Sequence, residues 1–347
     1  MQHCFPVPEL RYSCDIRRGL ILRLAADFRP ERGTIMSQTH HLPSLPETVH
    51  WGFWDAALPP VLKIASGDRV LIDTLSGEPD DMPDGGRGAV EGHLEVHARN
   101  QRGAGPHFLT GPVYVEGALP GDVLEVKILD IQLRQDWGWN LQAPGKGTLP
   151  EDFPDKRRVH IPLDGTAMVA RPPWGGEIPL RPFFGNFGVA PSPELGQLTS
   201  VIPREFGGNM DNKEMIAGTT VYFPVFNEGA LFSAGDGHAA QGDGEVCLTA
   251  IETSLSGTLE LTVRKDIKLS MPRCETADSW ISMGMDEDLD EAARQALREM
   301  IDLICEVSGL SRQDAYSLCS LAADLRVTQL VDVNKGIHCV LPKGVLP

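Results

Sequence analysis

The sequence has few cysteines and no long uninterrupted hydrophobic run. Only 7 of its 347 residues are cysteine, an odd number, and none form a CxxC pair or a zinc-finger spacing. They are Cys4, Cys14, Cys247, Cys274, Cys305, Cys319 and Cys339. This pattern argues against a disulfide framework and indicates reduced, buried thiols. No apolar stretch approaches the roughly 18 residues of a membrane-spanning helix. We therefore expect a cytoplasmic protein without a membrane partner.

Basic residues are also scarce relative to acidic ones. The chain has 31 Lys and Arg against 48 Asp and Glu, a formal net charge of −17. A nucleic-acid partner is not expected, because binding to phosphates requires a concentrated basic face. A neutral or cationic small molecule is compatible with this charge. Acidity that serves only solubility explains the charge equally well.

Glycine and proline are abundant, with 36 and 27 residues, and 41% of the chain is hydrophobic. The sequence can therefore build a substantial core, with many turns and short strands. Residues 1–35 differ from the rest because they carry Arg17, Arg18, Arg23, Arg29 and Arg32. We interpret them either as a disordered extension or as an artefact of an upstream start site. Residues 36–347 are expected to form one unit.

Short strands dominate the region 42–270. Gly-Asp turns precede β-branched runs at 66–73 and 120–128, and further strands are predicted at 219–226, 246–253 and 258–263. Such closely spaced strands favour a sandwich or barrel over a Rossmann-type alternation. The stretch 137–196 has the composition of a long loop, which in a compact domain usually covers a site or an interface.

Helices are predicted only in the C-terminal third. Residues 288–308 place apolar side chains at helical spacing and end at Gly309, and Ser311 to Asp314 resembles a capping box that opens a second helix to about 323. This helical insertion spans 286–324, and a closing strand is expected within 326–345. The predicted fold class is α+β, mainly β: a multi-stranded sandwich or barrel core with a small C-terminal helical subdomain.

The run 232–245 is the most informative for function. It places Asp236, His238, Asp243 and Glu245 within ten residues, alternating with glycines. Glycine permits close backbone approach, so such a loop can gather these side chains around one point. An imidazole with carboxylates suits zinc, whereas oxygen ligands alone favour calcium or magnesium. A hairpin turn with solvated acids is an equally good interpretation of the run alone.

Three other places offer polar groups that can serve a site. The turn 204–211 presents Asn209 and Asp211, His107 and Glu116 flank the stretch 106–118, and Asp73 ends an apolar strand. A buried carboxylate such as Asp73 must reach either solvent or a partner. Each of these features has an ordinary structural explanation, and for a lone histidine that explanation is the more common one.

Taken together and in this order, these stretches resemble the acetamidase/formamidase family. The resemblance rests on the Gly-Gly-Asn-Met-Asp turn at 207–211, the Ser-Ala-Gly-Asp-Gly-His-Ala-Ala-Gln-Gly-Asp-Gly-Glu run at 233–245 and the stretch 110–122. The ending from 324 to 343 is also similar. The match covers about 42–345, and residues 1–35 have no counterpart.

The resemblance implies hydrolysis of a short carboxamide such as formamide or acetamide to the acid and ammonia. It also implies a mainly β fold, a homo-oligomer and a bound divalent metal, with zinc ranked before calcium. The aromatic stretches 137–139 and 172–174 exceed the needs of a formamide pocket.

We hypothesise that a metal-activated water attacks the amide, because no Gly-Gly-Ser-Ser-Gly run and no Glu/Lys/Cys set of other amidases is visible. The expected metal ligands are Asp236 and His238, with Asp73 and His107 as additional ones. The expected catalytic residues are Glu116 or Glu245 as general base, Asn209 and Asp211. Gly207, Gly208 and Asp243 complete the set as substrate-binding residues.

Two other functions remain open at this point. One is hydrolysis of a larger amide, a carbamate or a cyclic amide on the same scaffold. The other is a non-catalytic, calcium-stabilised β-sandwich binding module, for which Trp137, Trp139 and Trp174 offer aromatic platforms. The binding module also requires a secretory signal, which the sequence does not show.

Overall fold

The computed structural model describes residues 37–86 and 88–347. The predictions for residues 1–35, together with Cys4 and Cys14, therefore lie outside the described residues. Residues 37–347 form one compact unit, and within them no helix is long and apolar enough to cross a membrane.

Two large sheets make up most of this unit. The first follows the order β1 (Thr39–Leu42), β5 (Asp68–Asp73), β18 (Leu255–Arg264), β7 (Val123–Leu133), β15 (Thr220–Pro224), β19 (Arg273–Glu275), β20 (Ser279–Asp286), β22 (Lys335–Pro342) and β21 (Asp324–Gln329). Nearly all neighbours in it are antiparallel, and only β1 runs parallel to its partner β5.

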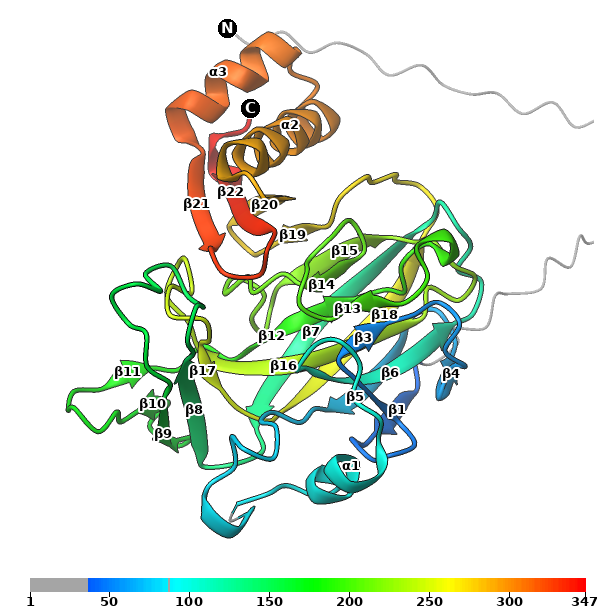
Figure 1. Cartoon of the computed structure of the whole chain (residues 1–347). Helices are drawn as coiled ribbons and strands as arrows, with labels where there is room; N and C mark the ends of the chain where they lie inside the picture. The colour runs from blue at the N-terminus through cyan, green and yellow to red at the C-terminus, as the bar shows by residue number, and fades with distance from the viewer. Residues whose placement is uncertain (1–36, 87) are drawn as a thin grey trace, which may run out of the picture. The chain divides into compact units, whose positions relative to one another are not determined.

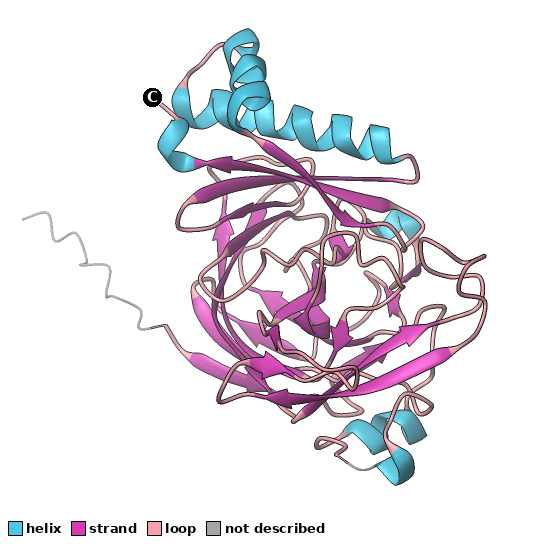
Figure 2. Ribbon diagram, turned by 90° about the vertical axis from the view of Figure 1, so that its left-hand side faces the viewer, coloured by secondary structure: helices cyan, strands magenta, loops and turns pink. Residues whose placement is uncertain are grey.

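The second sheet follows the order β11 (Ile178–Pro179), β10 (Val169–Ala170), β9 (Arg157–Asp164), β8 (Trp137–Gln142), β17 (Ile251–Glu252), β16 (Phe232–Ala240), β12 (Phe183–Gly188) and β14 (Gly207–Asn209). Strand β6 (Phe108–Val115) joins it at β16 and also pairs with β2 (Val49–Trp51) and β4 (Leu62–Ile64). A separate pair consists of β3 (Phe53–Trp54) and β13 (Leu198–Thr199). Figure 2 shows the strands curving around a common interior.

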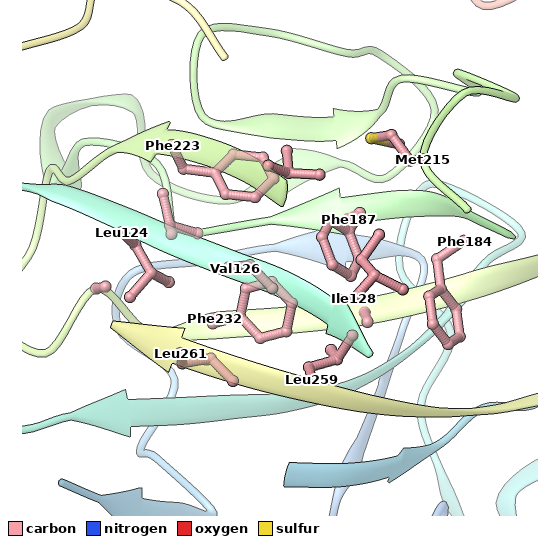
Figure 3. Close-up of a cluster of buried hydrophobic side chains, with 14 of the residues drawn as sticks. Leu124, Val126, Ile128, Phe184, Phe187, Met215, Phe223, Phe232, Leu259 and Leu261 are labelled. Carbon is pink, nitrogen blue, oxygen red and sulfur yellow. The ribbon is translucent and has the colours of Figure 1, made fainter. Parts of the chain in front are cut away.

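The main hydrophobic core lies between these two sheets. In β18, Leu259 and Leu261 are fully buried, while Thr258 and Glu260 are only partly covered. This alternation is the period-2 pattern of a strand with one buried face. Figure 3 shows β18 and β7 facing phenylalanines of the second sheet, among them Phe187 and Phe232. The mainly β sandwich-like core with a small helical part is confirmed.

The C-terminal helices form as the sequence predicts. Helix α2 (Leu289–Ser308) starts at Asp288, whose side chain accepts hydrogen bonds from two backbone N–H groups, and ends at Gly309 with φ 74°. Helix α3 (Arg312–Ala322) starts at the capping residue Ser311. Helix α2 packs on β20 and β22, and α3 packs on α2 and β22, through a hydrophobic cluster of their own (Figure 1).

Several local predictions differ from the structure. The stretch 137–196 contains β8, β9, β10, β11 and β12 and is not a loop. Strands β10 and β11 have only two residues each, too few to show a periodicity. In β9, by contrast, buried Val159, Ile161 and Leu163 alternate with less buried residues. The stretch 326–345 is a hairpin of two strands, β21 and β22, rather than one strand. Only Ile251–Glu252 of the strand predicted at 246–253 exists, and helix α1 (His93–Arg99) was not expected.

The run 233–245 also differs from its prediction as a loop, because most of it is strand β16. This strand lies between β12 on one edge and β6 and β17 on the other. A Cβ atom at Gly235 would collide with the backbone of Phe108, and one at Gly237 with that of Thr253. The glycines therefore permit neighbouring strands to approach closely, and do not form a flexible turn.

Buried histidines link the stability of this fold to pH. His93 on α1 is fully buried, and its Nε2 lies 2.8 Å from the carbonyl oxygen of Gly77. Burial lowers the pKa of His93 from its ordinary 6.5 to about 4. The unfolded chain therefore binds a proton at a pH where the folded chain does not. The contribution of neutral His93 is complete above about pH 6.5 and is lost as the pH falls toward 4.

We predict that the variant His93→Gln, which keeps an N–H donor for Gly77, changes this pH dependence. The free energy of unfolding of the wild-type protein should fall relative to the variant by about 1.4 kcal/mol per pH unit between pH 6.5 and 4. Urea unfolding of both proteins at several pH values measures the difference. A difference that is constant with pH would contradict the prediction.

Candidate functional site

A cavity of about 370 Å³ opens beside the second sheet, and its lining includes a group of buried acids with one buried and one partly buried imidazole. We call these side chains the carboxylate–histidine cluster. Its members are His107, Asp211, Asp236, His238, Glu245, Glu252 and Asp332. Five of the seven are acids, so the cluster is strongly negative when all of them are ionised. Such a concentration of buried charge requires protons or a cation for compensation.

Strand β16 supplies the centre of the cluster. Asp236 has φ 57°, in the left-handed region, and the pairing of β16 with its neighbours shifts register between Phe232 and Ala234 and between His238 and Ala240. These irregularities re-aim side chains, as β-bulges do. Glu252 on β17 pairs directly with His238, so the two side chains share one face of the sheet.

His238 is the geometric centre of the cluster. Its Nε2 lies 3.3 Å from Glu252 Oε1, 3.6 Å from Asp236 Oδ2 and 3.9 Å from Asp211 Oδ1. His107 approaches from the start of β6, with its Nε2 3.7 Å from Asp236 Oδ2. These separations exceed hydrogen-bond length except at Glu252, so most of the atoms face a common point without bonding to one another.

Polar groups behind the cluster hold it in place. The Nδ1 of His238 lies 2.9 Å from Gln241 Oε1, and Gln241 Nε2 donates to the carbonyl oxygen of Asp211 at 2.7 Å. Asn209 Nδ2 donates to Asp211 Oδ2 at 2.9 Å, and the Oδ1 of Asn209 accepts from Asn186. Asn209 therefore orients Asp211, as outer residues orient the ligands of metal sites.

The electrostatics of the cluster follow from burial and repulsion. Burial, together with Asp211 nearby, raises the pKa of Glu245 and of Asp332 well above their ordinary values. Burial and Asp236 raise the pKa of Glu252 to about 7, despite the opposing effect of His238. Burial alone would lower the pKa of His238, but Glu252 and Asp236 raise it well above 6.5. The cluster thus retains protons that a bound cation would displace.

The donor set fits a divalent metal ion. Two overlapping groups have ligand atoms within 4.8 Å of one another: Asp211, His238 and Glu245 form one, and Asp236, His238 and Glu252 form the other. Asp211 Oδ1, Glu252 Oε2 and Asp332 Oδ2 are buried and have no hydrogen-bond partner among the described residues. Buried oxygens without partners are costly unless they have a ligand. Imidazole with carboxylates suits zinc, and the excess of oxygens also suits calcium.

Gly185 on β12 keeps the centre of the cluster open. A Cβ atom at this position would contact Asp211 Oδ1 and would lie 2.7 Å from Asp236 Oδ2 and 2.8 Å from His238 Cε1. Any side chain at residue 185 would therefore occupy the space that the ligand atoms surround.

Of the predicted site residues, the structure brings together His107, Asn209, Asp211, Asp236, His238 and Glu245, all of which line the cavity. Asp73 and Glu116 do not line this cavity, unlike what was predicted for them. Asp73 pairs with His41 at 2.9 Å and accepts from Ser256, so its partner is structural. The carboxylate of Glu116 is half exposed and pairs with Lys63 at 3.1 Å.

The three predicted substrate-binding residues also lie off the cavity lining. Asp243 pairs with Lys213 at 2.9 Å and faces a second cavity of about 440 Å³. Gly207 and Gly208 pair with β12 and adopt φ values of 96° and 83°, which glycine permits in the segment that leads to Asn209.

Sequence reasoning missed Glu252, Asp332, Gly185 and Asn186. Glu252 lies within the strand predicted at 246–253. A carboxylate inside a predicted strand is the signal that singled out Asp73, and it applies to Glu252 as well. Asp332 lies in the turn after β21, and its apolar neighbours Val331 and Val333 are the signal that could have marked it as buried.

The sequence of this chain is similar to a known family of proteins. The model of the acetamidase/formamidase family matches residues 39–200 and 196–346. The chain belongs to this family. The resemblance seen in the sequence is therefore confirmed.

Three similar proteins illustrate the family. A formamidase from Methylophilus methylotrophus is 27% identical over 269 residues, which is 63% of this chain and 63% of the relative's length. An acetamidase structure from Bacillus halodurans has TM-score 0.75 and 32% identity and covers 87% of this chain and 97% of its own. A gamma lactamase from Delftia acidovorans has TM-score 0.58 and 25% identity and covers 88% and 93%.

We predict that Gly185→Ala abolishes tight binding of a divalent ion, because the added methyl group enters the space between the ligand atoms. Zinc titration by calorimetry should show at least about a 100-fold loss of affinity. This is the upper end of the loss caused by mutating residues that hydrogen-bond to metal ligands. The matched control is Gly165→Ala, where the new Cβ would lie 3.6 Å from a single side-chain atom of Leu133. Wild-type affinity in Gly185→Ala would contradict the assignment of this centre.

Proposed function

We propose that this protein hydrolyses a small linear carboxamide to the carboxylic acid and ammonia, at the carboxylate–histidine cluster and with a bound divalent metal. The observation that carries the proposal is the set of buried carboxylate oxygens near His238 that line a cavity and have no hydrogen-bond partner among the described residues. Relatives named formamidase and acetamidase support the reaction class.

The metal ligands that we propose are His238, Asp236 and Asp211, with Glu252 and His107 as additional ligands. His238 shares one set of ligand atoms within 4.8 Å of one another with Asp236 and Glu252, and a second set with Asp211 and Glu245. His107 Nε2 lies 3.7 Å from Asp236 Oδ2. Zinc is the first candidate and calcium the second. In such a site a divalent ion supplies Lewis acidity toward a carbonyl oxygen and toward water.

Residues of the chain itself transfer the proton and bind the substrate. Attack of water on the amide carbon forms a C–O bond, the C–N bond breaks, and one proton of the water must reach the leaving nitrogen. We assign this transfer to the carboxylate of Glu245, which is buried, lines the cavity and lies beside Asp211 and His238. One positioned carboxylate can accept the proton and then return it to the amine.

Asn209 completes the proposed arrangement. One of its amide hydrogens points to Asp211 Oδ2, and the side chain also lines the cavity. An amide group carries two N–H donors. The second one can therefore donate to the oxygen of the substrate, where negative charge develops.

A second candidate substrate is a cyclic amide. The structural similarity to the gamma lactamase from Delftia acidovorans supports it. The same attack on a lactam opens the ring and leaves the amine attached to the acid, so no ammonia is released. Ring opening of 2-pyrrolidinone, followed by chromatography, separates the two candidates.

We predict that ammonia release from carboxamides depends on a divalent ion. The measurement is ammonia formed from formamide, acetamide and propionamide by protein of known metal content, before and after treatment with a chelator. Turnover should fall to background and return when zinc or calcium is added. Turnover that persists in metal-free protein would contradict the role of the metal, and absence of ammonia from every amide would contradict the reaction.

We also predict that Glu245→Gln lowers kcat by about 100- to 10,000-fold while the protein still binds its metal, because the amide cannot carry the proton. The matched control is Glu194→Gln, a substitution at an exposed glutamate away from both cavities. Loss of metal together with activity would show instead that Glu245 is a ligand.

A further inference from the structure

The cavity is larger than acetamide requires. Its volume is about 370 Å³, and a water molecule occupies about 30 Å³ of liquid. The cavity therefore has room for roughly twelve non-hydrogen atoms, in the range of sites that enclose drug-sized ligands. Acetamide would leave most of this space to water.

One wall of the cavity is apolar and begins directly beside the cluster. Trp139 on β8 pairs with Glu252 on β17, so the indole and this carboxylate lie next to each other on one face. Leu141 follows two residues later on the same strand and therefore on the same face. Both line the cavity, and Trp139 is 8% exposed. The indole Nε1 donates to Ser76 Oγ at 3.3 Å, which fixes the plane of the ring.

Other segments contribute more apolar surface. Leu75, which follows β5, and Phe108 at the start of β6 are buried and line the same cavity. Leu248 adds a side chain from the segment after Glu245, where its φ of 116° departs from the usual backbone regions. Residues from four separate parts of the chain thus contribute apolar surface to the lining of this cavity.

Outside the cluster, the charged residues of the cavity lining do not favour a ligand of either sign. The other ionisable residues of the lining are two acids, Glu78 and Asp81, and two bases, Arg102 and Lys146. Arg102 pairs with Glu78 at 2.7 Å, and Asp81 pairs with Arg158 at 2.7 Å. Three of these four groups belong to ion pairs, and a lining of mixed sign favours a neutral ligand body over an ionic one.

We propose that the substrate is a carboxamide with a flat, apolar acyl group, of the size of an arylacetamide, which packs against Trp139 and Leu141 while its amide reaches the cluster. The aromatic wall favours an aromatic partner, because ring pairs gain from their preferred geometry beyond the area that they bury. This inference rests on the proposed amide hydrolysis and specifies its substrate class.

The test compares phenylacetamide with acetamide on the metal-loaded, full-length protein. We expect kcat/KM for phenylacetamide to exceed that for acetamide by at least about 10-fold, the lower end of what one additional methylene contributes in an apolar pocket. In Leu141→Trp the larger side chain takes up space that the phenyl group would occupy. This variant should therefore lower the ratio of the two kcat/KM values at least about 10-fold. The matched control Leu195→Trp, at a partly exposed leucine outside the cavity lining, should keep the wild-type ratio.

Acetamide cleaved as efficiently as phenylacetamide, or more efficiently, would overturn the inference and leave amide hydrolysis intact. An unchanged ratio in Leu141→Trp would also overturn it. If no amide releases ammonia, calorimetric titration with phenylacetamide and with acetamide tests the aromatic occupant separately from the reaction. Preferential binding of phenylacetamide, weakened in Leu141→Trp, would support the aromatic occupant while the proposed reaction fails. Equal binding of the two amides in that case would contradict both the aromatic occupant and the proposed reaction.

Discussion

Mutual repulsion among five buried carboxylates is the constraint on which the rest of this structure depends. Asp211, Asp236, Glu245, Glu252 and Asp332 line a single cavity, and among the described residues of its lining two imidazoles accompany them. Isolated ionised groups at this depth would cost far more free energy than a domain of this size can spare. The cluster persists because protons or a cation compensate its charge and because a rigid double sheet holds the side chains in position. The outer hydrogen bonds of Asn186, Asn209 and Gln241 serve the same end.

The fold class and part of the cluster could be predicted from the sequence. The two capped helices carry strong local signals at Asp288, Gly309 and Ser311, and the alternation in β18 is a local property as well. Asp236 and His238 stand out because they lie two residues apart in a glycine-rich run. Local patterns of this kind do not depend on the rest of the fold.

The remainder of the site depends on contacts between distant segments. Glu252 belongs to the cluster only because β17 pairs with β16, and Asp332 only because of the turn that follows β21. Asp73 and Glu116 illustrate the opposite case. Each is a carboxylate at the end of a strand, but Asp73 meets His41 and Ser256, and Glu116 meets Lys63. A sequence shows that a buried acid needs a partner without showing which partner the fold provides.

The position of Asp332 has a consequence for the order of events during synthesis. The ribosome makes His107 and the whole of β16 well before Asp332, which lies in the turn between β21 and β22. Domains usually fold as units while the chain emerges from the ribosome. Because residues 37–347 form one compact unit, the cluster is complete only when the hairpin of β21 and β22 has left the exit tunnel. The side chains of His107 and β16 are therefore made early, and the site that they belong to is finished late.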